Sequence, residues 1–219
     1  MIKNIIFDMD GVLINTEPIH FRIWQQICSE HGVTLEYERY IACIGSTVKY
    51  LHDLLKEWYG LSFHNNPEIM RRFRECKEEI LQKEGLPAIE GAADTVKWLY
   101  DQGYTMAVAS SSSQNYIDYS IHALGLDQYF HKLISGESVK HPKPAPDVFL
   151  KAAQQLGADP KECLVIEDSK NGSIAAKAAG MSCYGFYNPD SGNQDLSAAD
   201  FIFYSYDELK AKLTALPPF

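Results

Sequence analysis

Apolar and polar positions alternate along this chain with two different periods. Short apolar runs, typical of buried strands, occur at residues 5–7 and again throughout the second half of the chain. Between them lie longer stretches in which apolar residues recur every three or four positions, as they do in amphipathic helices. From residue 91 the two patterns alternate, which predicts helices over 91–102, 114–124, 146–156, 171–179 and 206–214, and strands over 104–109, 132–135, 163–166, 182–186 and 201–203.

Residues 16–88 show only the helical pattern, which predicts helices over 17–31, 46–59 and 67–84. Apolar strands that alternate with helices form parallel sheets with helices on both faces. We therefore predict an α/β fold with a Rossmann-like, doubly wound parallel sheet as its core. Residues 1–15 and 89–219 would form this core, and residues 16–88 would form an all-helical cap domain inserted after the first strand.

Composition narrows the class of protein. The chain has 219 residues, 46% of them apolar, and a net charge of −9, which argues against binding to nucleic acid or to an anionic membrane. No apolar run approaches the ~20 residues that a membrane span needs. The five cysteines are odd in number and lack C-x-x-C spacing, so we expect reduced thiols in a cytoplasmic protein. We expect a monomer.

Two aspartates follow directly after the first strand, at Asp8 and Asp10. Residues two apart on a strand face the same side, so these carboxylates would lie about 6.6 Å apart along the backbone. Such a pair repels unless a proton or a cation intervenes. Gly11 would let the chain turn sharply beside a ligand. An acidic turn after a strand is also common without any function, so the pair needs partners elsewhere in the chain.

Three other segments supply such partners. The strand over 104–109 runs into four serines, among which Ser110 or Ser111 would contact phosphate oxygens, although a serine there could also only cap the next helix. The strand over 163–166 ends in Glu167 and Asp168, which could complete an oxygen-rich Mg²⁺ site. Lys143 stands between two prolines, which hold the backbone rigidly.

The carboxyl ends of parallel strands meet at one edge of the sheet, so we expect these side chains to converge. An aspartate there can attack phosphorus and form an aspartyl-phosphate. Mg²⁺ and Lys143 would neutralise charge on the transferring oxygens. Asp10 would protonate the departing oxygen and then take a proton from the attacking water.

These motifs, in this order along nearly the whole chain, resemble the haloacid dehalogenase superfamily, in the branch that contains β-phosphoglucomutase and sugar-phosphate phosphatases. The resemblance implies a Mg²⁺-dependent phosphatase that hydrolyses a small phosphorylated metabolite, most simply a sugar phosphate. It also implies the roles of individual residues: Asp8 as nucleophile, Asp10 as general acid and base, Ser110 and Lys143 as phosphoryl ligands, and Asp8, the Asp10 carbonyl and Asp168 as Mg²⁺ ligands, with Glu167 as an additional or indirect one.

Two other functions compete with this interpretation. β-Phosphoglucomutase shares every core residue, and its segment resembles residues 16–24 here, including a cap histidine at His20 that could equally be a solvent-facing helix residue. The mutase, however, binds a second phosphate with an arginine where this chain has Val48, and Lys49 would have to substitute. A signalling receiver domain also pairs acidic residues with a lysine on a parallel sheet, but such a domain is shorter and has no place for the helical insertion of this chain.

Overall fold

The computed structural model describes residues 1–44, 46–192 and 194–215. The chain divides into two compact units. One unit consists of Met1–Asn15, Ala88–Pro189 and Gln194–Phe219, and the other of Thr16–Pro87 with Asp190–Asn193. These bounds differ from the predicted ones at Ala88 and at Asp190–Asn193.

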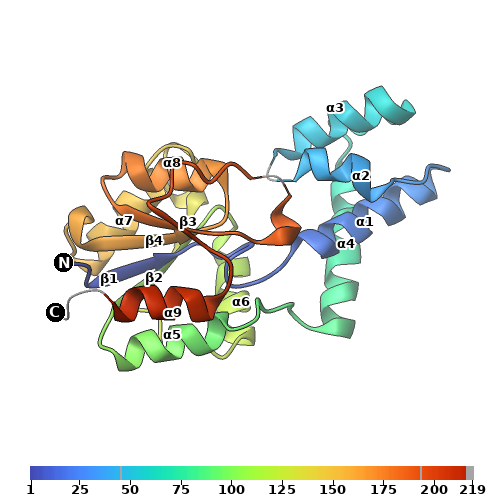
Figure 1. Ribbon diagram of the computed structural model, residues 1–219. Helices are drawn as coiled ribbons and strands as arrows, with labels where there is room; N and C mark the ends of the chain where they lie inside the picture. The colour runs from blue at the N-terminus through green and yellow to red at the C-terminus, as the bar shows by residue number, and fades with distance from the viewer. Residues whose placement is uncertain (45, 193, 216–219) are drawn as a thin grey trace. The chain divides into compact units, whose positions relative to one another are not determined.

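Six parallel strands form the sheet of the first unit, in the order β3-β2-β1-β4-β5-β6 (Figure 1). The central strand β1 (Asn4–Phe7) pairs with β2 (Thr105–Ser110) on one side and β4 (Cys163–Glu167) on the other. The outer strands complete the sheet: β3 (Lys132–Ser135), β5 (Ser182–Phe186) and β6 (Phe201–Phe203). All four residues of β1 are buried, because helices cover both faces of the sheet. The predicted α/β fold is confirmed.

Helices α7 (Asp147–Leu156) and α8 (Lys170–Ala178) lie on one face of this sheet (Figure 1). Their apolar sides pack on alternate strand residues, among them Ile6, Ala107 and Val165, in one buried cluster. On the opposite face, α5 (Ala92–Asp101) lies beside α9 (Tyr206–Thr214), and α6 (Gln114–Ala123) packs against β3. The order of the strands reverses at β1, between β2 and β4, which is where open α/β sheets bind ligands.

The second unit is helical. Its helices are α1 (Glu17–Glu30), α2 (Tyr37–Tyr40), α3 (Val48–Tyr59) and α4 (Pro67–Glu84) (Figure 1). Helix α3 begins two residues later than predicted, because the Thr47 hydroxyl accepts a hydrogen bond from the Tyr50 amide and caps the helix there. The pattern of apolar residues missed α2, which is too short to show a helical period.

All five cysteines are unpaired and buried, and burial raises the pKa of each thiol above its usual value. None of the helices that the structure describes is both long and apolar enough to cross a membrane.

Candidate active site

The carboxyl ends of β1, β2 and β4 bring the predicted acids, serines and lysine together. Phe7 lies level with Val108 on one neighbour and with Ile166 on the other, so the next residue, Asp8, emerges between these two strands. Its amide donates to the Ile166 carbonyl at 2.9 Å, which keeps Asp8 in line with the sheet. The Asp8 side chain is nearly buried at the point where the strand order reverses.

Lys143 reaches this strand end from the segment that precedes α7. Its Nζ donates to Asp8 Oδ1 at 2.6 Å, to Glu167 Oε1 at 2.8 Å and to the Ala109 carbonyl at 3.3 Å. Three acceptors match the three protons of the ammonium group. Nζ also lies 4.6 Å from the centre of the Phe149 ring, which adds a cation–π contact. Lys143 is therefore fixed beside Asp8 as a buried cation.

The surroundings of Asp8 change the pKa of its carboxyl group. Burial raises the pKa of its carboxyl to about 7, while Lys143 acts in the opposite direction and Glu167 and Asp10 add to the rise. Burial acts to lower the pKa of Lys143, but Asp8 and Glu167 together outweigh it and hold that pKa above its usual value, so the ammonium stays charged. One ammonium cannot neutralise two buried carboxylates. A further positive charge would therefore favour the ionised form of Asp8.

Glu167 supports the lysine from the far side. Its second oxygen, Oε2, accepts from the Ser169 amide at 2.7 Å and from the Ser169 hydroxyl at 2.8 Å. Gly172 makes room for this carboxylate, because a Cβ at that position would lie 1.5 Å from Glu167 Oε1. Gly172 was not among the predicted site residues, although a glycine in the first turn of a helix is an unusual choice. The partners of Glu167 favour the indirect role among the two that we predicted.

Asp10 lies in a different environment from Asp8. Its Oδ2 accepts a hydrogen bond from the Ser112 hydroxyl at 2.7 Å and a longer one from the Ser110 hydroxyl at 3.4 Å. The Ser110 hydroxyl also accepts from the Ser112 amide at 3.1 Å. Ser110 is buried and Ser111 is exposed. We predicted a phosphate contact at Ser110 or Ser111, and Ser112, the partner of Asp10, was not among the predicted site residues.

Asp168 lies against the turn that follows Asp10. Gly11 has a φ of +81°, and a Cβ added there would lie only 1.9 Å from Asp168 Oδ2. Glycine is therefore required at position 11 both by the left-handed backbone and by the neighbouring carboxylate. This close approach brings a second acidic side chain next to the Asp8–Gly11 segment.

The chemistry of this donor set fits a divalent cation. Among the described residues, no three His, Cys, Asp or Glu side chains form a metal-binding group by themselves. The carboxylate of Asp10 accepts from two hydroxyls, and that of Glu167 accepts from the Lys143 ammonium. The predicted metal ligands are the side chains of Asp8 and Asp168, with the Asp10 backbone carbonyl as a third oxygen, and this assignment stays a prediction. Hard oxygen donors with excess negative charge suit Mg²⁺, which keeps several of its waters.

The two predicted cap residues lie in the helical unit. His20 Nδ1 is 3.8 Å from Glu17 Oε1, and the His20 ring lies against Phe73. Lys49 is largely exposed and pairs with Asp53 at 2.9 Å. Their role in substrate binding stays a prediction.

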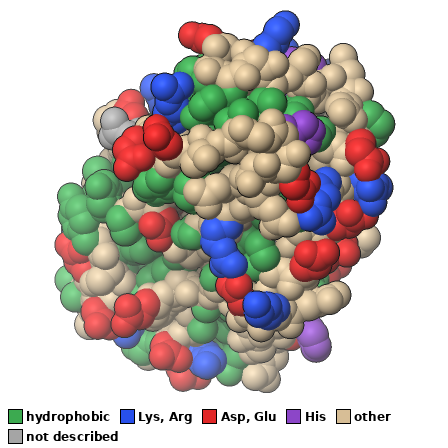
Figure 2. Space-filling view, turned by 90° about the vertical axis from the view of Figure 1, so that its right-hand side faces the viewer, with side chains coloured by type: hydrophobic (Ala, Val, Ile, Leu, Met, Phe, Trp, Pro, Cys, Tyr) green, Lys and Arg blue, Asp and Glu red, His purple; other side chains and the backbone are tan. Residues whose placement is uncertain are grey.

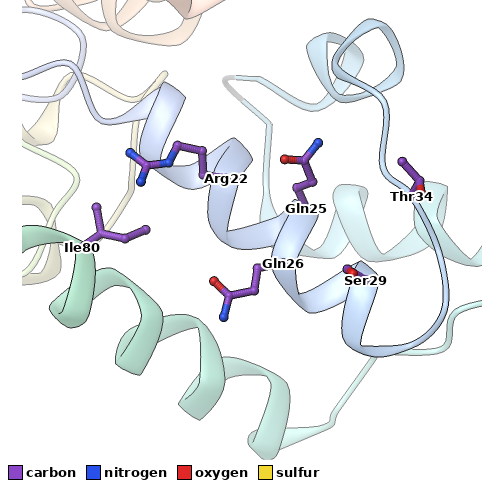
Figure 3. Close-up of a pocket in the computed structure, with 6 residues that line it drawn as sticks. All are labelled: Arg22, Gln25, Gln26, Ser29, Thr34 and Ile80. Carbon is purple, nitrogen blue, oxygen red and sulfur yellow. The ribbon is translucent and has the colours of Figure 1, made fainter.

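The helical unit also has a pocket of about 500 Å³ along α1 and α4, with a polar lining (Figure 3). Arg22 lines it, but its Nη1 and Nη2 already donate to Glu84, at 2.7 and 2.6 Å. None of the predicted site residues lines this pocket. On the face that Figure 2 shows, acidic and basic side chains lie interspersed with apolar ones.

Comparison with known proteins identifies the family. The sequence model of the haloacid dehalogenase-like hydrolases matches residues 5–186. The chain belongs to this family. It is 33% identical to the fructose-1-phosphate phosphatase YqaB of Escherichia coli (strain K12) over 81% of this chain and 92% of that one. It is also 32% identical to hexitol phosphatase B of Escherichia coli (strain K12), over 94% of both chains.

A solved structure supports the same assignment. The crystal structure of a HAD family hydrolase from Deinococcus radiodurans R1, with bound phosphate and sodium, is 30% identical to this chain. It superposes with a TM-score of 0.83 and covers 97% of this chain and 95% of that one. This haloacid dehalogenase-like protein is thus a hydrolase that acts on phosphate monoesters.

Proposed function

We propose that this protein is a Mg²⁺-dependent phosphatase that hydrolyses a sugar phosphate or a sugar-alcohol phosphate through an aspartyl-phosphate on Asp8. The observation that carries the proposal is the contrast between two neighbouring carboxylates. Asp8 is nearly buried and paired with the Lys143 ammonium, whereas Asp10 is bound by two hydroxyls. Different environments give two carboxylates different tasks, here nucleophile and proton carrier.

In the first half-reaction an Asp8 oxygen attacks phosphorus, and the bond from phosphorus to the leaving alcohol oxygen breaks. Asp10 delivers a proton to that oxygen, so the alcohol departs neutral. In the second half-reaction Asp10 takes a proton from a water molecule, which attacks the phosphorus of the aspartyl-phosphate. Inorganic phosphate leaves and the Asp8 carboxylate is restored.

Lys143 contributes a fixed positive charge throughout these steps. Its Nζ lies 2.6 Å from Asp8 Oδ1, so it would also face the oxygens of a phosphoryl group on Asp8. When bound by Asp8, Asp168 and the Asp10 carbonyl, Mg²⁺ would supply further positive charge for the transferring phosphoryl oxygens. Glu167 acts through the lysine, because it holds the ammonium from the other side at 2.8 Å.

The substrate class rests on the relatives named above, which are phosphatases of fructose 1-phosphate and of hexitol phosphates. A small phosphorylated metabolite and a cytoplasmic location remain part of this proposal. In the helical unit, Val48 is exposed and carries no charge that could bind a second phosphate, which favours hydrolysis over mutase chemistry.

The test is phosphate release from a panel of sugar and hexitol phosphates, with Mg²⁺ and with excess EDTA. We expect turnover that stops in EDTA, returns when Mg²⁺ is restored and is absent in Asp8→Asn. β-Glucose 1-phosphate with a trace of the bisphosphate is included to detect mutase activity. Glucose 6-phosphate formed much faster than phosphate is released would contradict the proposal, as would full turnover in EDTA.

A further inference from the structure

The loop that follows Asp8 is held by side chains from the end of the sheet unit. The loop closes on itself: the Gly11 amide donates to the Ile14 carbonyl at 2.7 Å, and the Leu13 amide donates to the Met9 carbonyl at 2.8 Å. Two of its carbonyls accept side-chain hydrogen bonds from elsewhere in the unit. Asn188 Nδ2 donates to the Gly11 carbonyl at 3.0 Å, and the Tyr206 hydroxyl donates to the Val12 carbonyl at 2.6 Å.

Both donors are buried. Asn188 is 4% exposed and follows β5, and Tyr206 is 2% exposed and begins α9. The Tyr206 ring packs against both Phe186 and Phe203, with ring centres 5.4 and 5.8 Å away. The region that the family model matches ends at residue 186, and both donors lie after it.

The same loop carries the proton carrier of the proposed reaction. Asp10 lies directly before Gly11, and its carboxylate accepts from Ser112 at only 2.7 Å. On its other side Gly11 touches the Asp168 carboxylate so closely that a Cβ would not fit. A shift of the loop therefore moves Asp10 relative to Ser112 and to any leaving group, and general acid catalysis is sensitive to such displacements.

We propose that Asn188 and Tyr206 are positioning residues, which clamp the Gly11 and Val12 carbonyls and thereby hold Asp10 in place for proton transfer. The inference rests on the proposed function, because it assigns the clamp to the step in which Asp10 protonates the leaving alcohol. A purely structural role predicts a different pattern: lower stability, with equal effects on every substrate.

The test uses Tyr206→Phe, which removes only the hydroxyl and keeps the ring, and Asn188→Ala. Tyr184→Phe is the matched control, since Tyr184 is another largely buried tyrosine of this unit and its ring packs on Phe201. Each variant is assayed well below its melting temperature, with a hexitol phosphate and with p-nitrophenyl phosphate. The second substrate has a leaving group that needs little help from an acid.

For both clamp variants we expect kcat on the hexitol phosphate to fall about tenfold or more, against less than about threefold on p-nitrophenyl phosphate. Asp10→Asn should show the same split more strongly, and Tyr184→Phe should change neither rate. Equal losses on the two substrates in an active enzyme would overturn the clamp. A wild-type protein that releases no phosphate, or an Asp10→Asn variant without the split, would instead overturn the proposed function and the clamp with it.

Discussion

Gly11→Ala is a small change with a large expected effect, because two independent features of the structure oppose it. The backbone at Gly11 has a φ of +81°, which costs a residue with a Cβ about 1–2 kcal/mol. The new methyl group would also lie 1.9 Å from Asp168 Oδ2 and 2.5 Å from its carboxyl carbon.

The size of the displacement follows from these distances. Ordinary carbon–oxygen contact begins near 3.4 Å, so the 1.9 Å approach requires the carboxylate or the loop to give way by roughly 1.5 Å. A misplacement of about 1 Å at a reacting centre can cost 10²-fold in rate. We therefore expect phosphate release to fall by at least about 10²-fold, with the free energy of unfolding lowered by only ~1–3 kcal/mol.

Gly180→Ala is the control. Gly180 has a similar φ of +75°, follows helix α8, and has no neighbouring atom within 4 Å of an added Cβ. It should lose about 1–2 kcal/mol of stability in urea unfolding and keep its activity. Equal activities of the two variants, measured as kcat on the best substrate, would refute the claim that Gly11 makes room for the Asp168 carboxylate.

Three further outcomes are expected. Lys143→Met leaves the buried carboxylates of Asp8 and Glu167 without their cation, so the free energy of unfolding in urea should fall by ~3–5 kcal/mol. Adding Glu167→Gln should restore part of this loss, and a loss below about 1 kcal/mol would contradict the buried ion pairs. Ser112→Ala removes a hydrogen bond to the Asp10 carboxylate and should slow hydrolysis of alkyl phosphates about tenfold. Ser113→Ala should leave the rate unchanged, because the Ser113 hydroxyl caps no helix, and equal rates of the two variants would remove Ser112 from the site. The helical unit should lose stability as pH falls below about 6.5, where His52 becomes protonated in the unfolded chain. Urea unfolding followed by tryptophan fluorescence at several pH values measures this loss, and His52→Phe should make the stability less dependent on pH.

The sign of this last effect follows from the surroundings of His52. The side chain is 5% exposed and lies among Trp24, Phe63 and His64. Burial lowers the pKa of the imidazole and His64 lowers it further, whereas Asp53 acts in the opposite direction. The folded state thus holds His52 neutral to lower pH than the unfolded state does. The stability that neutral His52 contributes is fully present above its pKa in the unfolded state, and it is lost as pH falls toward its pKa in the folded state.

Most of the fold could be predicted because strands and helices leave periodic patterns. The strands around Ile6, Val108 and Val165 are apolar runs buried on both faces, and their polar ends follow directly in the sequence. Parallel pairing then brings Asp8, Ser110 and Glu167 to one edge of the sheet. Lys143 could be predicted because the flanking prolines set it apart from an ordinary surface lysine.

The remaining contacts leave no such pattern. Ser112 looks like a helix-capping residue, and only the structure shows its hydroxyl on Asp10. Asn188 and Tyr206 donate to backbone carbonyls 177 and 194 residues away. Every residue has a backbone carbonyl, so the sequence does not indicate which one is the acceptor. Gly172 is recognisable only once the position of the Glu167 carboxylate is known.

The most direct test of the account is to trap the phosphoryl group on Asp8. Asp10→Asn should slow hydrolysis of the aspartyl-phosphate, so acid quenching after mixing with p-nitrophenyl phosphate and Mg²⁺ should preserve it. Mass spectrometry of the peptides is then expected to find one added phosphoryl group on the peptide that contains Asp8, and none when Asp8→Asn is added. A phosphoryl group on another residue, or steady hydrolysis by Asp8→Asn, would contradict the mechanism.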